Sequence, residues 1–355
     1  MTQISLANIE HYATENHVRL EWVQHAVLIE AFIRRACIVD GPFALKGSAV
    51  TRQFLNSLEL NARQRLMQDI DWLCLAPFSV EHSRSALNEW ADAVTRIYLD
   101  DGVQFRSFAE TQLWRMIDYA MDRDFPTVNT DLVATIAGQQ FQVNIDVSFN
   151  VMIVPAPVPL AYVPLFGESF VVPRTPPLAQ QIAWKLHQSI VRPRFKDLLD
   201  LTMLLRHNVV DADAVRDALL CECGQDGANP VQLKRLLDVS TPNTVGLKGH
   251  PAYRFPVTQL WNYWRHEQVA DGANAQDMSL RLNESLASEC VANADALPSE
   301  LGEFCRNLAD ALRSSGLADW IAELPGDLEK PIGESRERSL PTAWSVAAKW
   351  LGFRR

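Results

Sequence analysis

The segment from residue 43 to residue 57 restricts the fold more than any other part of this sequence. Its apolar start, Phe43-Ala-Leu, leads into Lys46-Gly47-Ser48, and a helical pattern follows. This order predicts a strand, a tight glycine turn and a helix. Glycine lets a ligand approach the backbone closely, and the start of a helix offers free N–H groups and a positive dipole end. The turn could therefore bind a phosphate group, although a Gly-Ser pair by itself more often marks an ordinary turn.

Two acidic residues mark the start of the next predicted strand. Asp69 and Asp71 stand two residues apart where the sequence becomes fully apolar. On a strand their carboxylates share one face, about 6–7 Å apart along the chain. Acidic pairs are common at the solvated start of a strand, so this pair alone does not indicate catalysis.

A β-hairpin is predicted further along the chain. Residues 132–136 and 141–149 alternate between apolar and polar side chains on either side of a glycine turn. Asp146 lies on the polar face of the second arm. If that face meets Asp69 and Asp71, the three carboxylates would repel one another unless a cation lay between them. Mg²⁺ prefers such hard oxygen ligands and usually accompanies a phosphate substrate.

The order of these features is typical of one enzyme superfamily. A Gly-Ser turn, an Asp-x-Asp pair and a later strand aspartate follow one another in polymerase-β-like nucleotidyltransferases. The sequence contains neither Gly-x-x-x-x-Gly-Lys-Ser/Thr nor Gly-x-Gly-x-x-Gly, so P-loop and Rossmann folds agree with it less well. We predict an α/β (α+β) protein. Residues 1–207 are expected to form a nucleotidyltransferase domain with a mixed sheet flanked by helices, and residues 208–355 a mostly helical domain.

Apolar residues at helical spacing are the main pattern in the rest of the chain. They predict helices at residues 17–37, 83–98, 107–122, 178–190 and 195–206. Beyond residue 207 the chain is expected to be mostly helical. A short strand is expected at residues 170–172.

Composition and charge exclude several other classes of protein. The chain has 355 residues, of which 48% are hydrophobic and 21% charged, as in a globular protein large enough for two domains. Its net charge of −10 excludes a generally cationic coat for nucleic acid, but not a local basic groove. Six cysteines without paired spacing indicate reduced thiols and a cytoplasmic protein. The longest apolar run, residues 151–166, is short and contains four prolines, so we expect no membrane-spanning segment.

Four segments resemble the AbiEii/AbiGii-type toxin nucleotidyltransferases of type IV toxin–antitoxin systems. Residues 43–71 resemble the family's Lys-Gly-Gly/Ser … Arg-x-Ser-x-Asp-Ile-Asp signature, and the strand with the third candidate carboxylate resembles its counterpart in the family. Residues 183–187 resemble the Ala-x-Lys-Leu motif, and residues 192–201 resemble the Arg-x-Lys-Asp-x-x-Asp-Leu motif. The sequence departs from the family at Ser48 and Met67, where a second glycine and a serine are usual.

The resemblance implies that the protein transfers a nucleotide from an NTP to an acceptor, with Mg²⁺ as cofactor and pyrophosphate as product. The implied acceptor is RNA, above all the acceptor end of tRNA, and the implied protein partner is an antitoxin. The metal ligands would be Asp69, Asp71 and Asp146, the last of which could instead deprotonate the acceptor hydroxyl. The implied catalytic residues are Asp69, Asp71, Asp146, Lys185 and Asp197. The implied nucleotide-binding residues are Lys46, Gly47, Ser48, Arg65 and Lys185.

Several of these residues are also consistent with purely structural roles. A lysine such as Lys185 on an amphipathic helix usually faces solvent. Asp197 in the first turn of a helix interacts favourably with the helix dipole without taking part in catalysis. Lys46 and Arg65 could simply neutralise nearby acids.

Two other functions remain open at the level of the sequence. The chain could modify a small molecule such as an antibiotic, or it could be a degenerate, non-catalytic binding module of the same fold. The basic residues at 192–196 and the aromatic and arginine residues at 253–255 and 261–265 could contact RNA. A solvated loop and a hydrophobic core are the alternatives for these segments.

Overall fold

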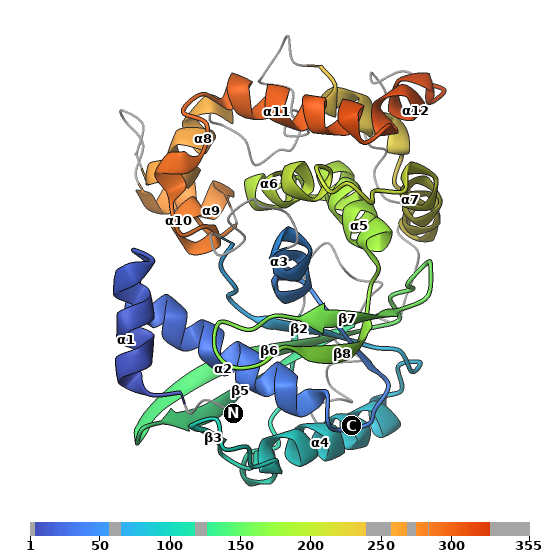
Figure 1. Cartoon of the computed structure of the whole chain (residues 1–355). Helices are drawn as coiled ribbons and strands as arrows, with labels where there is room; N and C mark the ends of the chain where they lie inside the picture. The colour runs from blue at the N-terminus through green and yellow to red at the C-terminus, as the bar shows by residue number, and fades with distance from the viewer. Residues whose placement is uncertain are drawn as a thin grey trace.

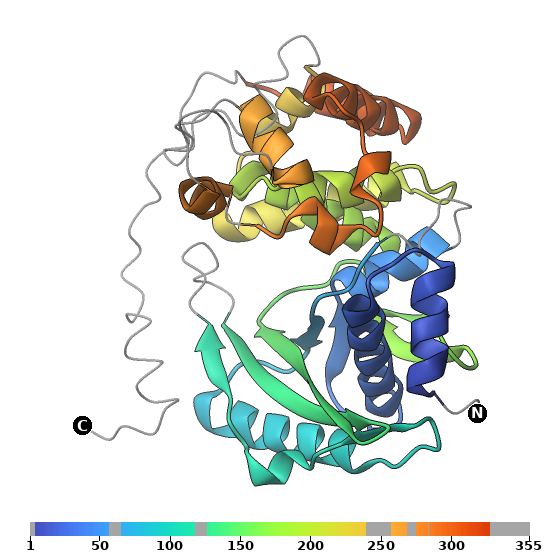
Figure 2. The same cartoon turned by 90° about the vertical axis from the view of Figure 1, so that its left-hand side faces the viewer.

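The protein consists of two layers, which Figures 1 and 2 show from two sides. The lower layer contains a β-sheet and the N-terminal helices, and the upper layer is helical. The helix α3 (Ser48–Asn56) lies between them and contacts β1, β2 and α6. The computed structural model describes residues 4–56, 65–117, 126–238, 257–267, 275–282 and 284–326.

The main sheet is mixed, as predicted from the sequence. Its strand order is β1-β2-β6-β5-β3, and β4 also pairs with β5. The pair β2 and β6 is parallel, whereas the other neighbouring pairs are antiparallel. The strands are β1 (Phe43–Lys46), β2 (Ile70–Cys74), β3 (Val103–Phe105), β4 (Arg115–Ile117), β5 (Thr127–Ile136) and β6 (Gln139–Phe149). A separate two-stranded sheet is formed by β7 (Val158–Tyr162) and β8 (Phe170–Thr175).

The hairpin of β5 and β6 gives the sheet one apolar and one polar face. Its register pairs Leu132 with Val143 and Asn129 with Asp146, so side chains of like character lie side by side. The apolar residues join a core cluster with α2 (Leu20–Ala36) and α4 (Val80–Arg96). The helix α1 (Leu6–Glu15) packs on α2. The polar face is left for the acidic residues.

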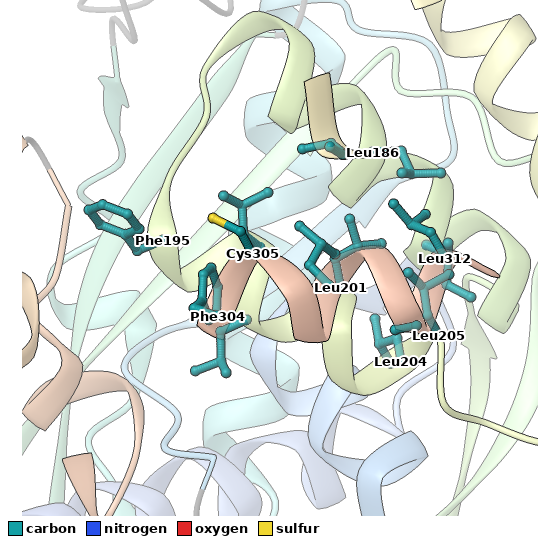
Figure 3. Packing of buried hydrophobic residues seen from close by; sticks show 14 of the residues in the cluster. Leu186, Phe195, Leu201, Leu204, Leu205, Phe304, Cys305 and Leu312 are labelled. Atoms are coloured by element: carbon teal, nitrogen blue, oxygen red, sulfur yellow. The ribbon is translucent and has the colours of Figure 1, made fainter. Parts of the chain in front are cut away.

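The upper layer encloses the second hydrophobic core, part of which Figure 3 shows. Leu186 of α5, Leu201 and Leu204 of α6, and Phe304 and Leu312 of α11 belong to this core. The helices α5 and α6 therefore pack with the C-terminal helices, while the domain boundary near residue 207 stays a prediction. The helices of this layer are α5 (Leu178–Val191), α6 (Phe195–Leu204), α7 (Ala212–Asp226), η3 (Pro230–Leu236), α8 (Val257–His266), α9 (Ala275–Leu282), α10 (Ala287–Cys290), η5 (Ala294–Ala296), α11 (Leu301–Ser314) and α12 (Leu317–Glu323). Within the described ranges, every helix is too short or too polar to cross a bilayer.

The helix predicted at residues 107–122 is wrong. The structure has a short 3₁₀ helix, η2 (Phe108–Glu110), followed by the strand β4. Pairing of β4 with β5 outweighs the local helical pattern, because an edge strand obtains its backbone hydrogen bonds from a partner that is distant in the sequence. The last residues of the predicted helix, from 118 onward, lie outside the described residues.

Candidate active site

Three carboxylates meet on the polar face where β2 and β6 run side by side. Asp71 is paired with Asp146 in the parallel register, and Asp69 lies two residues before Asp71, next to the start of β2. One oxygen from each of the three carboxylates lies within 4.8 Å of the others. The convergence expected from the sequence is thus present in the fold. Three carboxylate oxygens at this spacing can bind one divalent cation.

Repulsion between the carboxylates raises the pKa of one of them. The neighbouring Asp71 carboxylate and burial raise the pKa of Asp69 to about 6. Lys196, Lys46 and Arg65 oppose this rise. A divalent cation among the carboxylates would favour their charged forms, and Mg²⁺ suits such hard oxygen ligands. The donor set therefore fits the metal that the sequence implies.

The glycine turn faces one of these carboxylates at short range. Gly47 has a φ of +77°, and a Cβ atom on it would lie 2.0 Å from Oδ2 of Asp71. Both the backbone conformation and the lack of space therefore require glycine. The preceding residue, Lys46, is paired with Asp71 across β1 and β2, and its ammonium lies 3.1 Å from Asp71 Oδ1. Lys46 therefore helps to hold the Asp71 carboxylate in place.

Ser48 begins α3 directly after the glycine turn. Its hydroxyl oxygen is buried, and among the described residues it has no hydrogen-bond partner. Buried hydroxyl groups are nearly always bonded, so an unsatisfied one beside a helix N-terminus points to a ligand that supplies the partner. Phosphate oxygens match both the hydroxyl and the free N–H groups.

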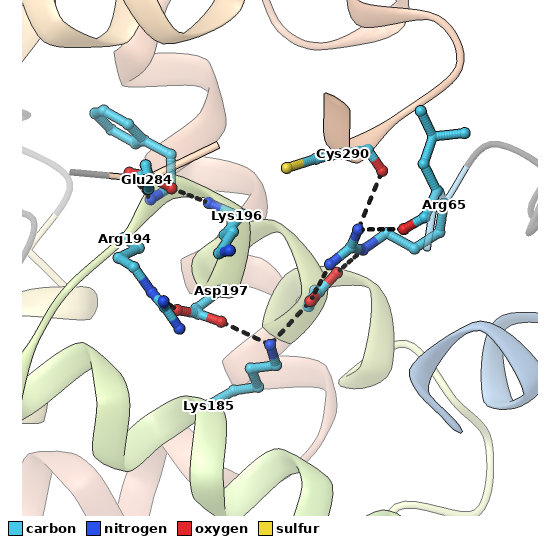
Figure 4. Close-up of polar contacts among 10 residues, drawn as sticks. Arg65, Lys185, Arg194, Lys196, Asp197, Glu284 and Cys290 are labelled. Carbon is cyan, nitrogen blue, oxygen red and sulfur yellow. Dashed lines mark hydrogen bonds and ion pairs between the residues drawn. The ribbon is translucent and has the colours of Figure 1, made fainter. Parts of the chain in front are cut away.

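A buried ionic network, which Figure 4 shows, joins α5 to α6. The Lys185 ammonium lies 2.6 Å from Asp197 Oδ1 and 2.9 Å from Asp200 Oδ2. Arg194 binds the other oxygen of Asp197, and Arg65 binds Asp200 at 2.6 Å. Lys185 therefore does not extend into solvent, as a lysine on an amphipathic helix usually does. Asp197 and Asp200 hold it in the interior.

The network keeps its members charged although they are buried. Burial by itself raises the pKa of Asp197, but Lys185 and Arg194 lower it far below its ordinary value. Burial acts on Asp200 in the same way, and Arg65 and Lys185 lower its pKa. Burial lowers the pKa of Lys185, and the two aspartates raise it above the ordinary value. Lys185, Asp197 and Asp200 are thus each stabilised by two opposite charges.

Arg65 connects the segment before β2 to the upper layer. Besides Asp200, its guanidinium donates to the carbonyl oxygens of Leu66 at 2.7 Å and Cys290 at 3.2 Å. The backbone of the same segment pairs with Val291, and the N–H of Leu66 donates to the Cys290 carbonyl. Arg65 and its neighbours therefore fix the stretch of chain that leads into Asp69.

Sequence reasoning missed one residue of this region. Glu284 accepts hydrogen bonds from the backbone N–H groups of Phe195 (2.9 Å) and Lys196 (3.0 Å) at the start of α6. Burial raises the pKa of Glu284 to about 7. No local signal could identify Glu284, because its partners lie far away in the sequence.

The aromatic residues of the segment 261–265, which could contact RNA according to the sequence, belong to the core. Trp261 and Trp264 are fully buried, and both rings pack against Phe195 with centroids 5.3 and 5.5 Å away. The structural alternative is therefore correct for Trp261 and Trp264. The other aromatic segment, residues 253–255, lies outside the described residues.

Comparison with known proteins gives one family and several solved structures. The family described as "Nucleotidyl transferase AbiEii toxin, Type IV TA system" matches residues 36–258. JHP933 from Helicobacter pylori is 14% identical, with a TM-score of 0.42 over 86% of this chain and 95% of that chain. MenT4, a nucleotidyltransferase toxin from Mycobacterium tuberculosis, is also 14% identical, with a TM-score of 0.47 over 89% of this chain and 99% of that chain. The comparison with curated proteins gives no match.

Proposed function

Because this chain belongs to the AbiEii nucleotidyl transferase toxin family of type IV toxin–antitoxin systems, we propose that it transfers a nucleotide from an NTP to RNA with the help of Mg²⁺. Membership of the family makes the chain a nucleotidyltransferase toxin and implies an antitoxin partner. The acceptor end of tRNA is the acceptor that we propose. The observation that carries the proposal is the set of three carboxylates, within 4.8 Å of one another, beside a glycine turn.

In this proposal the acidic residues hold the metal and the glycine turn holds the triphosphate. Asp69, Asp71 and Asp146 would bind Mg²⁺, which neutralises the charge that develops on the phosphate during transfer. The backbone of Gly47 and the hydroxyl of Ser48 would donate hydrogen bonds to phosphate oxygens. Asp146 would complete the metal site or accept the proton of the acceptor hydroxyl.

We propose that three basic residues affect the nucleotide mainly by holding other parts of the site in place. They are Lys46, Arg65 and Lys185. Lys46 is bound to Asp71, and Arg65 fixes the segment before Asp69. Lys185 and Asp197 form one ion pair, so we propose that they function as a unit. The unit is joined to the segment that leads into Asp69, because Lys185 also binds Asp200 at 2.9 Å and Asp200 binds Arg65 at 2.6 Å.

We also propose that the reaction takes place in the cytoplasm. The six cysteines are free thiols. Burial raises the thiol pKa of five of them, which makes these five unreactive. Free thiols are usual in the reducing cytoplasm, where NTPs and tRNA are available.

The test is label transfer to RNA. Purified protein is incubated with Mg²⁺, total RNA and each of the four labelled NTPs in turn. We expect label on RNA with at least one nucleotide, and loss of the label when the metal is chelated or when Asp71 is changed to Asn. Asp40→Asn, on a fully exposed side chain, is the matched control and should leave the activity unchanged.

Two results would contradict the proposal. If none of the four nucleotides labels RNA, RNA is not the acceptor. If label then appears on a small hydroxylated or amino compound, the chain is a small-molecule nucleotidyltransferase. If neither Mg²⁺ nor any NTP raises the melting temperature, the site does not bind its substrates, because a ligand specific for the folded state must stabilise it.

A further inference from the structure

We infer that the acceptor nucleic acid lies across β5 and β4, and that Arg115 and Asn129 bind its backbone. The inference rests on the proposed function and assigns it a binding surface for the acceptor. The surface consists of the polar side chains of Arg115, Asn129, Asp131 and Asn144, and we call it the acceptor face.

The first step of the argument is the register of the sheet. Neighbouring strands pair Lys46 with Asp71, Asp71 with Asp146, Asp146 with Asn129 and Asn129 with Arg115. Residues directly paired across strands project from the same face. The five side chains therefore form one polar row across β1, β2, β6, β5 and β4, with the candidate metal ligands in its middle.

The second step is the direction of the reaction. In phosphoryl transfer the attacking and leaving oxygens are roughly in line on opposite sides of the phosphorus. Gly47 and Ser48, which would hold the triphosphate, lie at the β1 end of the row. Pyrophosphate therefore leaves on that side, and the acceptor hydroxyl must approach from the β5 side. Since strands are spaced about 4.8 Å apart, Asn129 lies about 5 Å and Arg115 about 10 Å beyond Asp146 in this direction.

The third step is the chemistry of the acceptor face. Arg115 Nε donates to Asn129 Oδ1 at 2.8 Å, and Arg115 Nη2 lies 2.8 Å from Asp131 Oδ2. Because arginine only donates, Asn129 must present its oxygen to Arg115, and its Nδ2 donors are turned away from Arg115. Nη1 of Arg115 takes part in neither contact, and 47% of the side chain is exposed. A planar guanidinium whose Nη1 has no hydrogen-bond partner among the described residues is well suited to phosphate.

The residues next to this pair keep the arginine in position. Asn144 donates to Asp131 Oδ1 at 3.0 Å, so one oxygen of Asp131 is bound by Asn144 and the other by Arg115. The negative charge of Asp131 also partly offsets the attraction of Arg115 for a phosphate. Arg115 and Asp131 should therefore affect nucleic-acid binding in opposite directions, which a purely structural ion pair would not do.

The experiment measures KM for bulk tRNA and KM for the NTP in the label-transfer assay. Arg115→Ala should raise KM for tRNA about tenfold, the loss expected for one charge-assisted contact, and leave KM for the NTP unchanged. Asp131→Asn should lower KM for tRNA about twofold to threefold, because a repulsive charge is removed. Arg174→Ala is the matched control, since Arg174 is similarly exposed (42%) but contacts Gly41 and lines a pocket with Trp90 on the α4 side of the sheet.

The outcomes distinguish the acceptor face from a purely structural ion pair and from a failure of the proposed function. If the wild-type protein labels tRNA and Arg115→Ala leaves KM for tRNA unchanged, the acceptor face is wrong while the proposed function stands. If both variants raise KM for tRNA and lower the melting temperature together, the pair only stabilises the sheet edge, and the inference is overturned. If wild-type protein labels no RNA although NTP and Mg²⁺ raise its melting temperature, the RNA acceptor and the acceptor face both fail.

Discussion

At the scale of single residues, Gly47 has two functions that the sequence could only partly reveal. Its position after a strand predicts a turn that a phosphate can approach. The fold adds a second requirement, because the space where a Cβ atom would lie is filled by the Asp71 carboxylate. One glycine thus serves both the proposed triphosphate site and the proposed metal site.

Gly47→Ala should therefore reduce nucleotide transfer more than it reduces stability. The added methyl group would lie 2.0 Å from Asp71 Oδ2 and must displace this carboxylate. A displacement of about 1 Å at a reacting centre typically lowers the rate about 100-fold. Label transfer and Mg²⁺-dependent thermal stabilisation measure the two effects.

Gly138→Ala is the control for backbone strain. Gly138 also has a positive φ, +83°, but a Cβ atom on it would have nothing within 4 Å. Both variants strain the backbone, but Gly47→Ala also displaces Asp71, so only Gly47→Ala should lose transfer. Equal activity of the two variants would show that Asp71 does not need its present position.

The candidate site residues differ in how far the sequence could predict them. The acids and the glycine turn belong to short local patterns, and strand alternation is sufficient to place Asp146 on the polar face. The partner of Arg65 could not be predicted, because Asp200 binds Arg65 from 135 residues away. A charged residue in a sequence does not reveal which charge it will meet.

At the scale of elements, prediction succeeded where a segment carries its own pattern. The hairpin of β5 and β6 alternates over its whole length, and the helices α2, α4, α5 and α6 have continuous apolar stripes. The strand β4 has only three residues and depends on β5 for pairing. The start of α6 likewise depends on a distant residue, because Glu284, 89 residues beyond Phe195, accepts hydrogen bonds from its first N–H groups.

Glu284 should make the stability of the protein decrease between about pH 5 and pH 8. Burial raises its pKa to about 7 in the folded state, from 4.5 in the unfolded state. The folded state therefore binds more protons than the unfolded state in this range, and stability falls as the pH rises. The loss through this group is about 2 kcal/mol.

Glu284→Gln should remove this part of the pH dependence. Glutamine cannot ionise, and its amide oxygen can still accept a hydrogen bond from the start of α6. Urea unfolding at pH 5.5 and pH 8 measures the difference, with the exposed Glu303→Gln as the control. An equal decrease of stability in the wild type and in Glu284→Gln would rule out Glu284 as its source.

At the scale of the whole molecule, a few polar contacts join the sheet layer to the helical layer beside the acids. Arg65 binds Asp200 of α6 and the Cys290 carbonyl of α10, and Ser285 donates to Gln68 at 2.9 Å. These contacts span most of the length of the sequence. No local pattern predicts them, so the sequence indicated two domains but not how they are joined.

Asp200→Ala should destabilise the protein by about 3 kcal/mol, because it leaves Arg65 and Lys185 buried without one of their counter-charges. Since the pKa of Asp200 is lowered, its contribution is present above the ordinary aspartate pKa and is lost as the pH falls. The two proteins should therefore differ less in strong acid than at pH 7.

Denaturant unfolding of the wild type and of Asp200→Ala, at pH 7 and in strong acid, tests this prediction. Asp310→Ala removes an exposed aspartate that pairs with Arg313, and it should change stability little. A loss no larger than that of Asp310→Ala would mean that the buried network contributes little to the stability of the fold.

The contacts from residues 65–68 to the region of α10 have a genetic consequence. The glycine turn and the three candidate metal ligands are encoded by codons 47 to 146, but the segment that leads into Asp69 is anchored by residues 285–291. A nonsense or frameshift mutation anywhere upstream of the codon for Cys290 would remove that anchor. Cells that escape the toxin should therefore also carry truncations between the codons for Asp197 and Cys290, downstream of every proposed catalytic residue.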